Sequence, residues 1–234
     1  MNWRRWKTAL VLMALLGTAC PALFAQYRDM WGTRWNNPVS SFIGTSIYWK
    51  AMTKLPAKPR ASDAGAGTVT FRPVGKLPLP ETLAATFTQE AGQRAELAEA
   101  FRQFVEFFDA EAVKDKQPNN VARATAYFIA VNYMVATGKG VTEASAGALQ
   151  RALQENLPGN GKFQAMTHRQ RQELYESFVI FASLAYTGFQ QGESQKKPQQ
   201  MENFRAFARA SLKAVLGASP EEMRFTETGL VFVH

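Results

Sequence analysis

The segment 124–136, ATAYFIAVNYMVA, is apolar on nearly every face of a helix, and this feature restricts the folds open to the chain. A helix without a polar side is stable in water only when other elements surround it. Asn119 or Asn120 is a suitable N-cap for this helix, and Gly138 can end it in the left-handed conformation. The sequence therefore predicts a helix at the centre of a folded body.

A second segment, 173–189, has the same character. Most of its apolar side chains follow a helical spacing on one side, while Val179 and Ile180 lie on another side. Thr167 and Gln170 form a capping box at the start of this helix. We therefore expect two central apolar helices that pack together.

The remaining helices are expected to be apolar on one face only, at residues 80–89, 91–117, 141–157 and 198–216. Short extended segments are predicted at both ends of the body, at 68–73 and in the tail 223–233, and these two are expected to pair with each other. The predicted fold is all-α, a single helical bundle of about five to six main helices, preceded by a flexible arm.

The N-terminal residues have the order of a secretory signal peptide, with the positive MNWRRWK, an apolar run at 9–16 and small residues after it. The run is shorter than the roughly 20 residues of a membrane-spanning helix, and Pro21 interrupts it, so no transmembrane anchor is expected. Cleavage near Ala25 makes 1–25 the signal peptide and predicts a protein that is exported, either periplasmic or secreted.

Cys20 is the single cysteine of the chain and leaves a second form of processing open. A lipoprotein signal places a lipidated cysteine directly after a small-residue cleavage box, usually with leucine at the third position before the cysteine. Here Gly17 stands at that position and Pro21 follows the cysteine. Ordinary cleavage near Ala25 is therefore favoured, and lipidation of Cys20 is the alternative.

A mature chain without cysteine has no disulfide, no thiolate nucleophile and no cysteine-based zinc site. The only histidines are His168, which is expected to be exposed, and His234, and they are too few for a histidine metal site. No metal site and no cofactor are predicted. The formal net charge of +8 is spread along the chain without a dense basic cluster, so a nucleic-acid partner is not expected.

The arm, residues 26–67, is rich in tryptophan and ends in a linker of Pro, Gly, Ala and Ser at 54–67. A short helix is expected in the arm after Asn37 and Pro38. Tryptophans bury a large area at a small cost in conformational entropy, so they are either contact anchors for a partner or groups that pack back on the body. The binding candidates in the arm are Trp31, Trp35 and Trp49.

Four carboxylates on one predicted helix are the first candidates for catalysis: Glu106, Asp109, Glu111 and Asp115. A pair of carboxylates is the minimum equipment of a glycoside hydrolase. The helical pattern, however, places Glu106 and Asp109 on the solvent side, beside Arg102. A charged solvated face is therefore the favoured interpretation, and no catalytic residue is assigned.

Asn132 is a further binding candidate, because it lies on the same face as Phe128 in the most apolar helix. An unpaired buried amide costs roughly 1–3 kcal/mol, so either it bonds to a neighbouring helix or it faces a ligand in an apolar cleft. A group of tyrosines is open to the same two interpretations, and these are expected to cap the core with outward hydroxyls: Tyr127, Tyr133, Tyr175 and Tyr186.

Several stretches resemble a bacterial domain-of-unknown-function family of exported all-helical proteins: FRPVGKLPLPETLAATF, AELAEAFRQFVEFFDAEA, PNNVARATAYFIAVNYMV, QELYESFVIFASLAY and LKAVLGASPEEMRFTETGLVF. The resemblance covers roughly 71–232. It implies the helical fold and export, and it supplies no reaction.

Together these features predict an exported, non-catalytic binding or interaction module of the bacterial envelope, with the arm as its contact element and an envelope protein or a glycan as its partner. The alternative is an envelope enzyme, a glycan or peptide hydrolase with carboxylates in a cleft.

Overall fold

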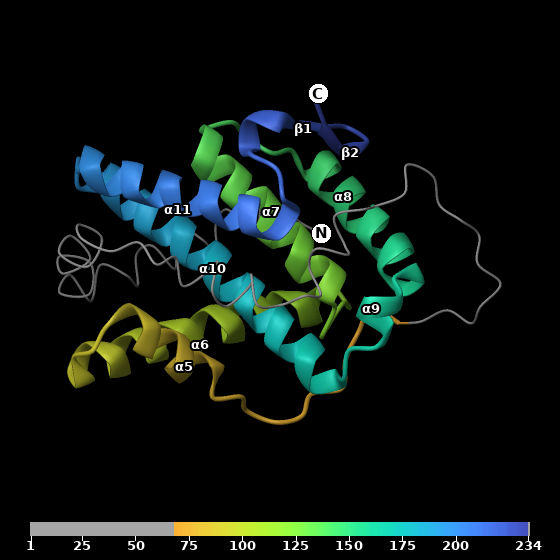
Figure 1. The fold of residues 1–234 in the computed structure, drawn as a ribbon, viewed down its shortest axis with the longest axis horizontal. Helices are drawn as coiled ribbons and strands as arrows, with labels where there is room; N and C mark the ends of the chain where they lie inside the picture. The colour runs from red at the N-terminus through yellow and green to blue at the C-terminus, as the bar shows by residue number, and fades with distance from the viewer. Residues whose placement is uncertain (1–67, 234) are drawn as a thin grey trace.

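Two helices, α7 (Val121–Thr137) and α10 (His168–Ser194), pack against each other in the middle of the bundle (Figure 1). The computed structural model of the chain describes residues 68–233. Every residue of α7 except Met134 and Thr137 is buried, as its all-round apolar pattern predicts. The two central helices are therefore confirmed, and the described part of the chain is all-α apart from one small hairpin.

The other helices surround this pair. Helix α11 (Pro198–Leu216) packs on both α10 and α7, and α8 (Glu143–Asn156) packs on α7. Helices α5 (Leu79–Phe87) and α6 (Ala91–Lys114) pack together, and α6 also contacts α10 (Figure 1). Two short helical turns lie between α8 and α10: η2 (Leu157–Gly159) and α9 (Gly161–Gln164). A third, η3 (Pro220–Glu222), follows α11.

The helix ends use the signals that the sequence carries. The Asn120 side chain accepts a hydrogen bond from the Arg123 backbone, and Gly138 ends α7 with a φ of 70°. Thr167 and Gln170 form the predicted capping box at the start of α10. These local signals therefore set the limits of the two central helices.

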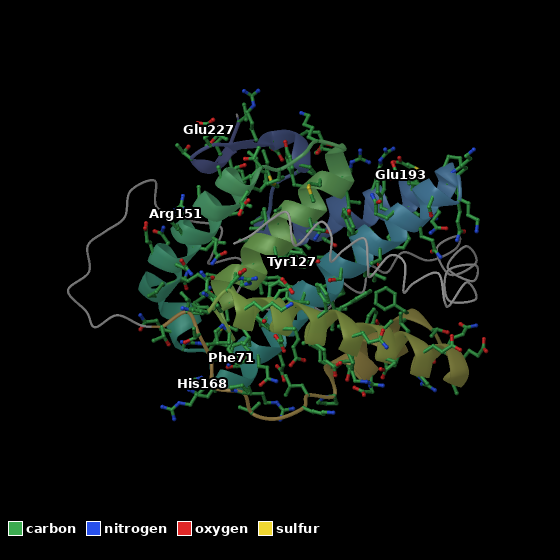
Figure 2. All side chains as sticks on the ribbon, turned by 180° about the vertical axis from the view of Figure 1, so that it is seen from behind. Phe71, Tyr127, Arg151, His168, Glu193 and Glu227 are labelled. Carbon is green, nitrogen blue, oxygen red and sulfur yellow. The ribbon has the colours of Figure 1, made fainter. Side chains whose placement is uncertain are left out.

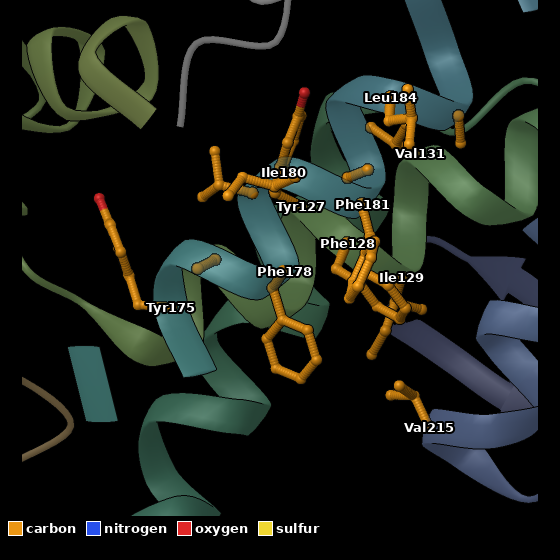
Figure 3. Close-up of a cluster of buried hydrophobic side chains, with 14 of the residues drawn as sticks. Tyr127, Phe128, Ile129, Val131, Tyr175, Phe178, Ile180, Phe181, Leu184 and Val215 are labelled. Atoms are coloured by element: carbon orange, nitrogen blue, oxygen red, sulfur yellow. The ribbon is translucent and has the colours of Figure 1, made fainter. Parts of the chain in front are cut away.

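Aromatic rings fill the space between α7 and α10 (Figure 3). The rings of Phe128 and Phe178 lie 4.8 Å apart between centroids, and both side chains are fully buried. Phe181 continues this layer toward α11, where its ring contacts Phe207. The layer joins three helices through apolar contact.

The predicted pairing of the two extended ends is wrong. Strand β1 (Met223–Thr226) pairs with β2 (Gly229–Phe232) in an antiparallel hairpin, and Gly229 has a φ of 118°. The 68–73 segment makes an isolated bridge instead, between Thr70 and Asn120. A tight hairpin turn closes a much shorter loop than a pairing of distant segments, so the tail folds back on itself.

No helix within residues 68–233 combines the length and the apolar character that crossing a membrane requires. The proposed signal peptide, 1–25, and the aromatic arm, 26–67, lie outside the described residues.

Helices α10 and α11 approach closely at Gly188. A Cβ atom built on Gly188 falls 2.0 Å from Cζ of Phe204, whose ring is 1% exposed. Real Cβ atoms do not come this close to a ring, so the side chain at 188 has to be absent for the two helices to pack.

Gly188→Ala is expected to lower the free energy of unfolding by about 1–3 kcal/mol, because the Phe204 ring must move into a filled core. Gly147→Ala on α8 is the matched control, since its Cβ has only an ordinary contact with Arg151, at 3.5 Å. This control is expected to keep or slightly raise stability, as alanine is the better helix former. Urea unfolding of both variants measures the difference, and equal effects would contradict the close packing at Gly188.

Candidate functional site

Of the four predicted binding residues, the structure describes only Asn132. Trp31, Trp35 and Trp49 lie outside the described residues. Asn132 is fully buried on α7, where its Nδ2 donates to the Phe128 carbonyl at 2.8 Å. Its Oδ1 has no hydrogen-bond partner among the described residues. The amide therefore bonds within its own helix. A bond to a neighbouring helix, one of the two interpretations from the sequence, is not seen among the described residues.

The expected solvent-side position on α6 is correct for Glu106 and wrong for Asp109. Asp109 is half-buried, Glu111 is buried beside Lys114, and Asp115 is half-buried in an ion pair with Arg123. Helix α6 is covered by α5 and by α10, so its buried arc is wider than one apolar stripe predicts.

The predicted outward orientation of the tyrosine hydroxyls is also wrong for two of the four. Tyr127 is fully buried and its hydroxyl lies 3.1 Å from Oγ of Ser183. The Tyr175 hydroxyl donates to Oδ1 of Asp109 at 2.6 Å. Buried hydroxyls need hydrogen-bond partners, and here the partners come from neighbouring helices.

Polar side chains gather where α10 meets α6 and the strap, a name we give to residues 72–78 (Figure 1, orange). Gln172 of α10 bonds to the strap twice, since its Oε1 accepts from the Val74 N–H and its Nε2 donates to the Gly75 carbonyl, each at 2.9 Å. The same Nε2 donates to Oε1 of Glu176 at 2.8 Å. We call the group of Asp109, Gln172, Tyr175 and Glu176 the junction cluster.

The two carboxyl groups of the junction cluster are shifted toward the neutral form. Burial raises the pKa of Glu176 to about 7, against the opposing effect of its bond from Gln172. Burial also raises the pKa of Asp109, while the hydrogen bond from Tyr175 lowers it. Burial, and then the Asp109 charge, raise the pKa of Tyr175 well above its usual value. A buried carboxyl group with a pKa near 7, here that of Glu176, is able to exchange protons at physiological pH.

Two arginines, Arg171 and Arg123, bond to segments next to this cluster. Arg171 donates to the carbonyls of Thr68 and Thr70, at 2.9 and 3.2 Å, and stacks over the Phe163 ring at 4.5 Å. Arg123 is fully buried, and its guanidinium lies 2.9 Å from Oδ2 of Asp115. His168, exposed as expected, accepts from the Arg72 N–H through Nδ1 at 3.2 Å (Figure 2).

Three residues here were not identified from the sequence: Arg171, Gln172 and Glu176. The only sequence signal was the acidic Glu176 inside an otherwise apolar run of α10, at a position that a central helix buries. Within residues 68–233, histidine, cysteine and acidic side chains form no group of three that could hold a metal ion.

Tyr175→Phe is expected to lower the free energy of unfolding by about 1.5–3 kcal/mol at pH 8, because it removes a hydrogen bond to the ionised Asp109. The loss is expected to be smaller at pH 4, where a protonated Asp109 accepts a weaker bond. Tyr186→Phe on the same helix is the control, since Tyr186 is only half-buried. Denaturant unfolding at both pH values tests this. A loss for Tyr175→Phe no larger than that for Tyr186→Phe would show that the bond adds no stability.

Comparison with known proteins identifies the chain only at the level of a family. The model of a family of unknown function, DUF6683, matches residues 51–233, which include the whole described body. The three tryptophans of the arm precede the matched region. No curated protein and no solved structure matches the chain. The match covers well over half of the sequence, and the chain therefore belongs to the DUF6683 family of unknown function.

Proposed function

We propose that this protein is an exported, non-catalytic binding or interaction module of the bacterial envelope. The proposal of export rests on the order of charged, apolar and small residues at 1–25, which is that of a signal peptide. The proposal of a binding role rests on the partners of the carboxylate groups in the described body.

The carrying observation is that Asp109, Asp115 and Glu176 are each bonded to another side chain of the folded body. Asp109 accepts from Tyr175 on α10, Asp115 pairs with Arg123 on α7, and Glu176 accepts from Gln172, which holds the strap. A hydrolase needs carboxylates that are free to reach a substrate. Asp109 and Asp115 instead join α6 to other helices, and Glu176 bonds to a side chain that holds the strap. These contacts support a body that carries a contact element.

The contact element in this proposal is the arm, with Trp31, Trp35 and Trp49 as anchors. Arg171 bonds to the carbonyls of Thr68 and Thr70, so the fixed body begins directly after the arm. Large aromatic side chains supply most of the energy at many interfaces. The partner class is an envelope protein or a glycan, both of which tryptophan rings bind well.

Intact-mass measurement of the exported protein tests the proposed compartment. The mature chain is expected to begin at or near Gln26 and to carry no acyl group, because Gly17 and Pro21 depart from a lipoprotein signal. A diacylated N-terminus at Cys20 would replace the proposed free protein with a lipid-anchored one. A mass that still includes 1–25 would contradict export by cleavage.

A truncated chain that starts at Thr68 tests the contact element. It keeps the Arg171 bonds to Thr68 and Thr70, so it is expected to remain folded and to melt cooperatively, as measured by circular dichroism. In a pull-down from envelope extract, this chain is expected to lose the partner that the full mature chain retains.

Two matched variants separate the tryptophans from the rest of the arm. A chain that starts at Ala51 keeps the family-matched region and lacks all three tryptophans, so it is expected to lose the partner as well. The triple variant Trp31→Ala, Trp35→Ala and Trp49→Ala in the full chain is expected to do the same. Retention of the partner by the folded Thr68 chain would place the contact surface on the helices instead.

An envelope hydrolase is the second candidate, and one observation favours it. Glu176 is buried and its pKa is raised to about 7, which is the property of a general acid, and Asp109 supplies a second carboxylate nearby. Hydrolysis of cell-wall glycan or peptide by the purified protein that Glu176→Gln abolishes would establish this candidate. Under the binding proposal no such hydrolysis is expected from either protein.

A further inference from the structure

The strap is attached to α10 through side chains. Residues 72–76 are exposed, and Leu77 is buried against the core. The hydrogen bonds from the strap to α10 run to Gln172, from Val74 and Gly75, and to His168, from Arg72. Attachment through so few polar contacts makes this segment able to open locally while the core stays folded.

Gln172 is fixed by Glu176 as well as by the strap. An amide nitrogen has two hydrogens to donate, and here one bonds to the Gly75 carbonyl and the other to Oε1 of Glu176. The remaining amide oxygen accepts from Val74. Glu176 therefore sets the direction in which the Gln172 amide faces, and this direction suits the two strap bonds.

Glu176 lies among negative groups. It is 8% exposed, and the charges that act on it are Asp109 of α6, Glu173 of α10 and Glu81 of α5. Two of these three carboxylates have a cation of their own, because Glu81 pairs with Arg102 and Glu173 with Arg169. Asp109 accepts a hydrogen bond from Tyr175. Ionisation of Glu176 with the strap closed thus adds a poorly hydrated negative charge near Asp109.

We propose that Gln172 and Glu176 form a proton-controlled latch for the strap, in which the protonated Glu176 keeps the strap closed on α10 and release of the proton favours its opening. Opening frees Gln172 from Val74 and Gly75 and admits water to the carboxyl group. The ionised form gains hydration by this change, and the neutral form gains much less.

The direction of the pH effect follows from the coupling between proton binding and closing of the strap. Glu176 has a pKa of about 7 in the closed form, against an ordinary value of 4.5. A group with a raised pKa in the closed form favours closing fully below pH 4.5, and this contribution is lost as the pH rises to 7. If the carboxyl regains its ordinary pKa on opening, the opening constant rises by up to roughly 300-fold across this interval.

His168 is the second residue of α10 that bonds to the strap, and it is an ionisable residue, so it is replaced in the test. Its Nδ1 accepts a hydrogen bond from the Arg72 N–H. Asparagine at position 168 offers a side-chain oxygen at a similar place and does not titrate. The comparison is therefore made in the His168→Asn background.

Hydrogen exchange of the full mature chain measures the opening. The protection factor of the Val74 amide, corrected for intrinsic exchange, is expected to fall at least tenfold from pH 5.5 to pH 8 in the His168→Asn chain. Addition of Glu176→Gln is expected to abolish this fall, because glutamine keeps an acceptor for Gln172 and carries no charge. Glu173→Gln in place of Glu176→Gln is the matched control and is expected to retain it.

Protection of the Phe128 amide in α7 is expected to stay constant in all these chains, which separates opening of the strap from unfolding of the core. A Val74 protection factor that does not change with pH, or one that changes equally after Glu176→Gln, would overturn the latch. If Glu176→Gln fails to fold, an NMR titration of the His168→Asn chain decides the matter. The Glu176 carboxyl and the Val74 amide are then expected to share one midpoint, and different midpoints would overturn the latch.

Discussion

Burial of α7 on all sides is the constraint on which the rest of the fold depends. A helix of this kind requires neighbours on every face, and α10, α11 and α8 supply contacts around it. Helix α10 is itself buried on all sides along residues 175–185. Helices α8 and α11 need only one apolar face for the core, and their outer faces carry charged residues. The arrangement of the other helices therefore follows from the position of α7. The hairpin packs on α8, and Thr70 of the leading segment 68–71 bridges to Asn120 at the start of α7.

A core of this kind sets strict conditions for the polar groups that enter it. Side chains such as Arg123 and Tyr127 are fully buried, and they are kept in place by an ion pair with Asp115 and by a contact with Ser183. Loss of one member of such a pair leaves the other buried and unsatisfied, which costs more than the bond itself contributes. The polar contacts of the interior therefore specify which helix faces meet, while the apolar rings supply most of the stabilisation.

The helices and their limits were predictable from the sequence, because they depend on local signals. Periodicity located the two central helices, and the caps at Asn120, Gly138 and Thr167 located their ends. The strand pairing of the two extended segments was not predictable in this way. Pairing of the tail with segment 68–73 and pairing of the tail with itself satisfy the same residue pattern, and only the geometry of the turn at Gly229 distinguishes them.

The polar cluster was missed for a related reason. A single helical wheel shows Asp109 as an outer residue of α6, and only the arrival of α10 from another direction makes it a partner of Tyr175. The joint role of Gln172 and Glu176 can be recognised only when the position of the strap is known, because Gln172 bonds to both the strap and Glu176. Residues that contact several separate elements do not follow a helical repeat in the sequence. Residues on the buried face of one helix do follow it.

The two proposals meet at one turn of α10. Arg171 holds the carbonyls of Thr68 and Thr70, and its neighbour Gln172 holds the strap at Val74 and Gly75. Consecutive side chains of one helix thus fix consecutive parts of the chain directly after the arm. The Arg171 contacts are made by a permanent cation, whereas the Gln172 contacts are linked to a carboxyl group that titrates near neutral pH. Residues 68–70, the start of the described body, are therefore held by contacts that do not depend on pH, next to a segment whose attachment does, so opening of the strap leaves this start of the body bound to α10.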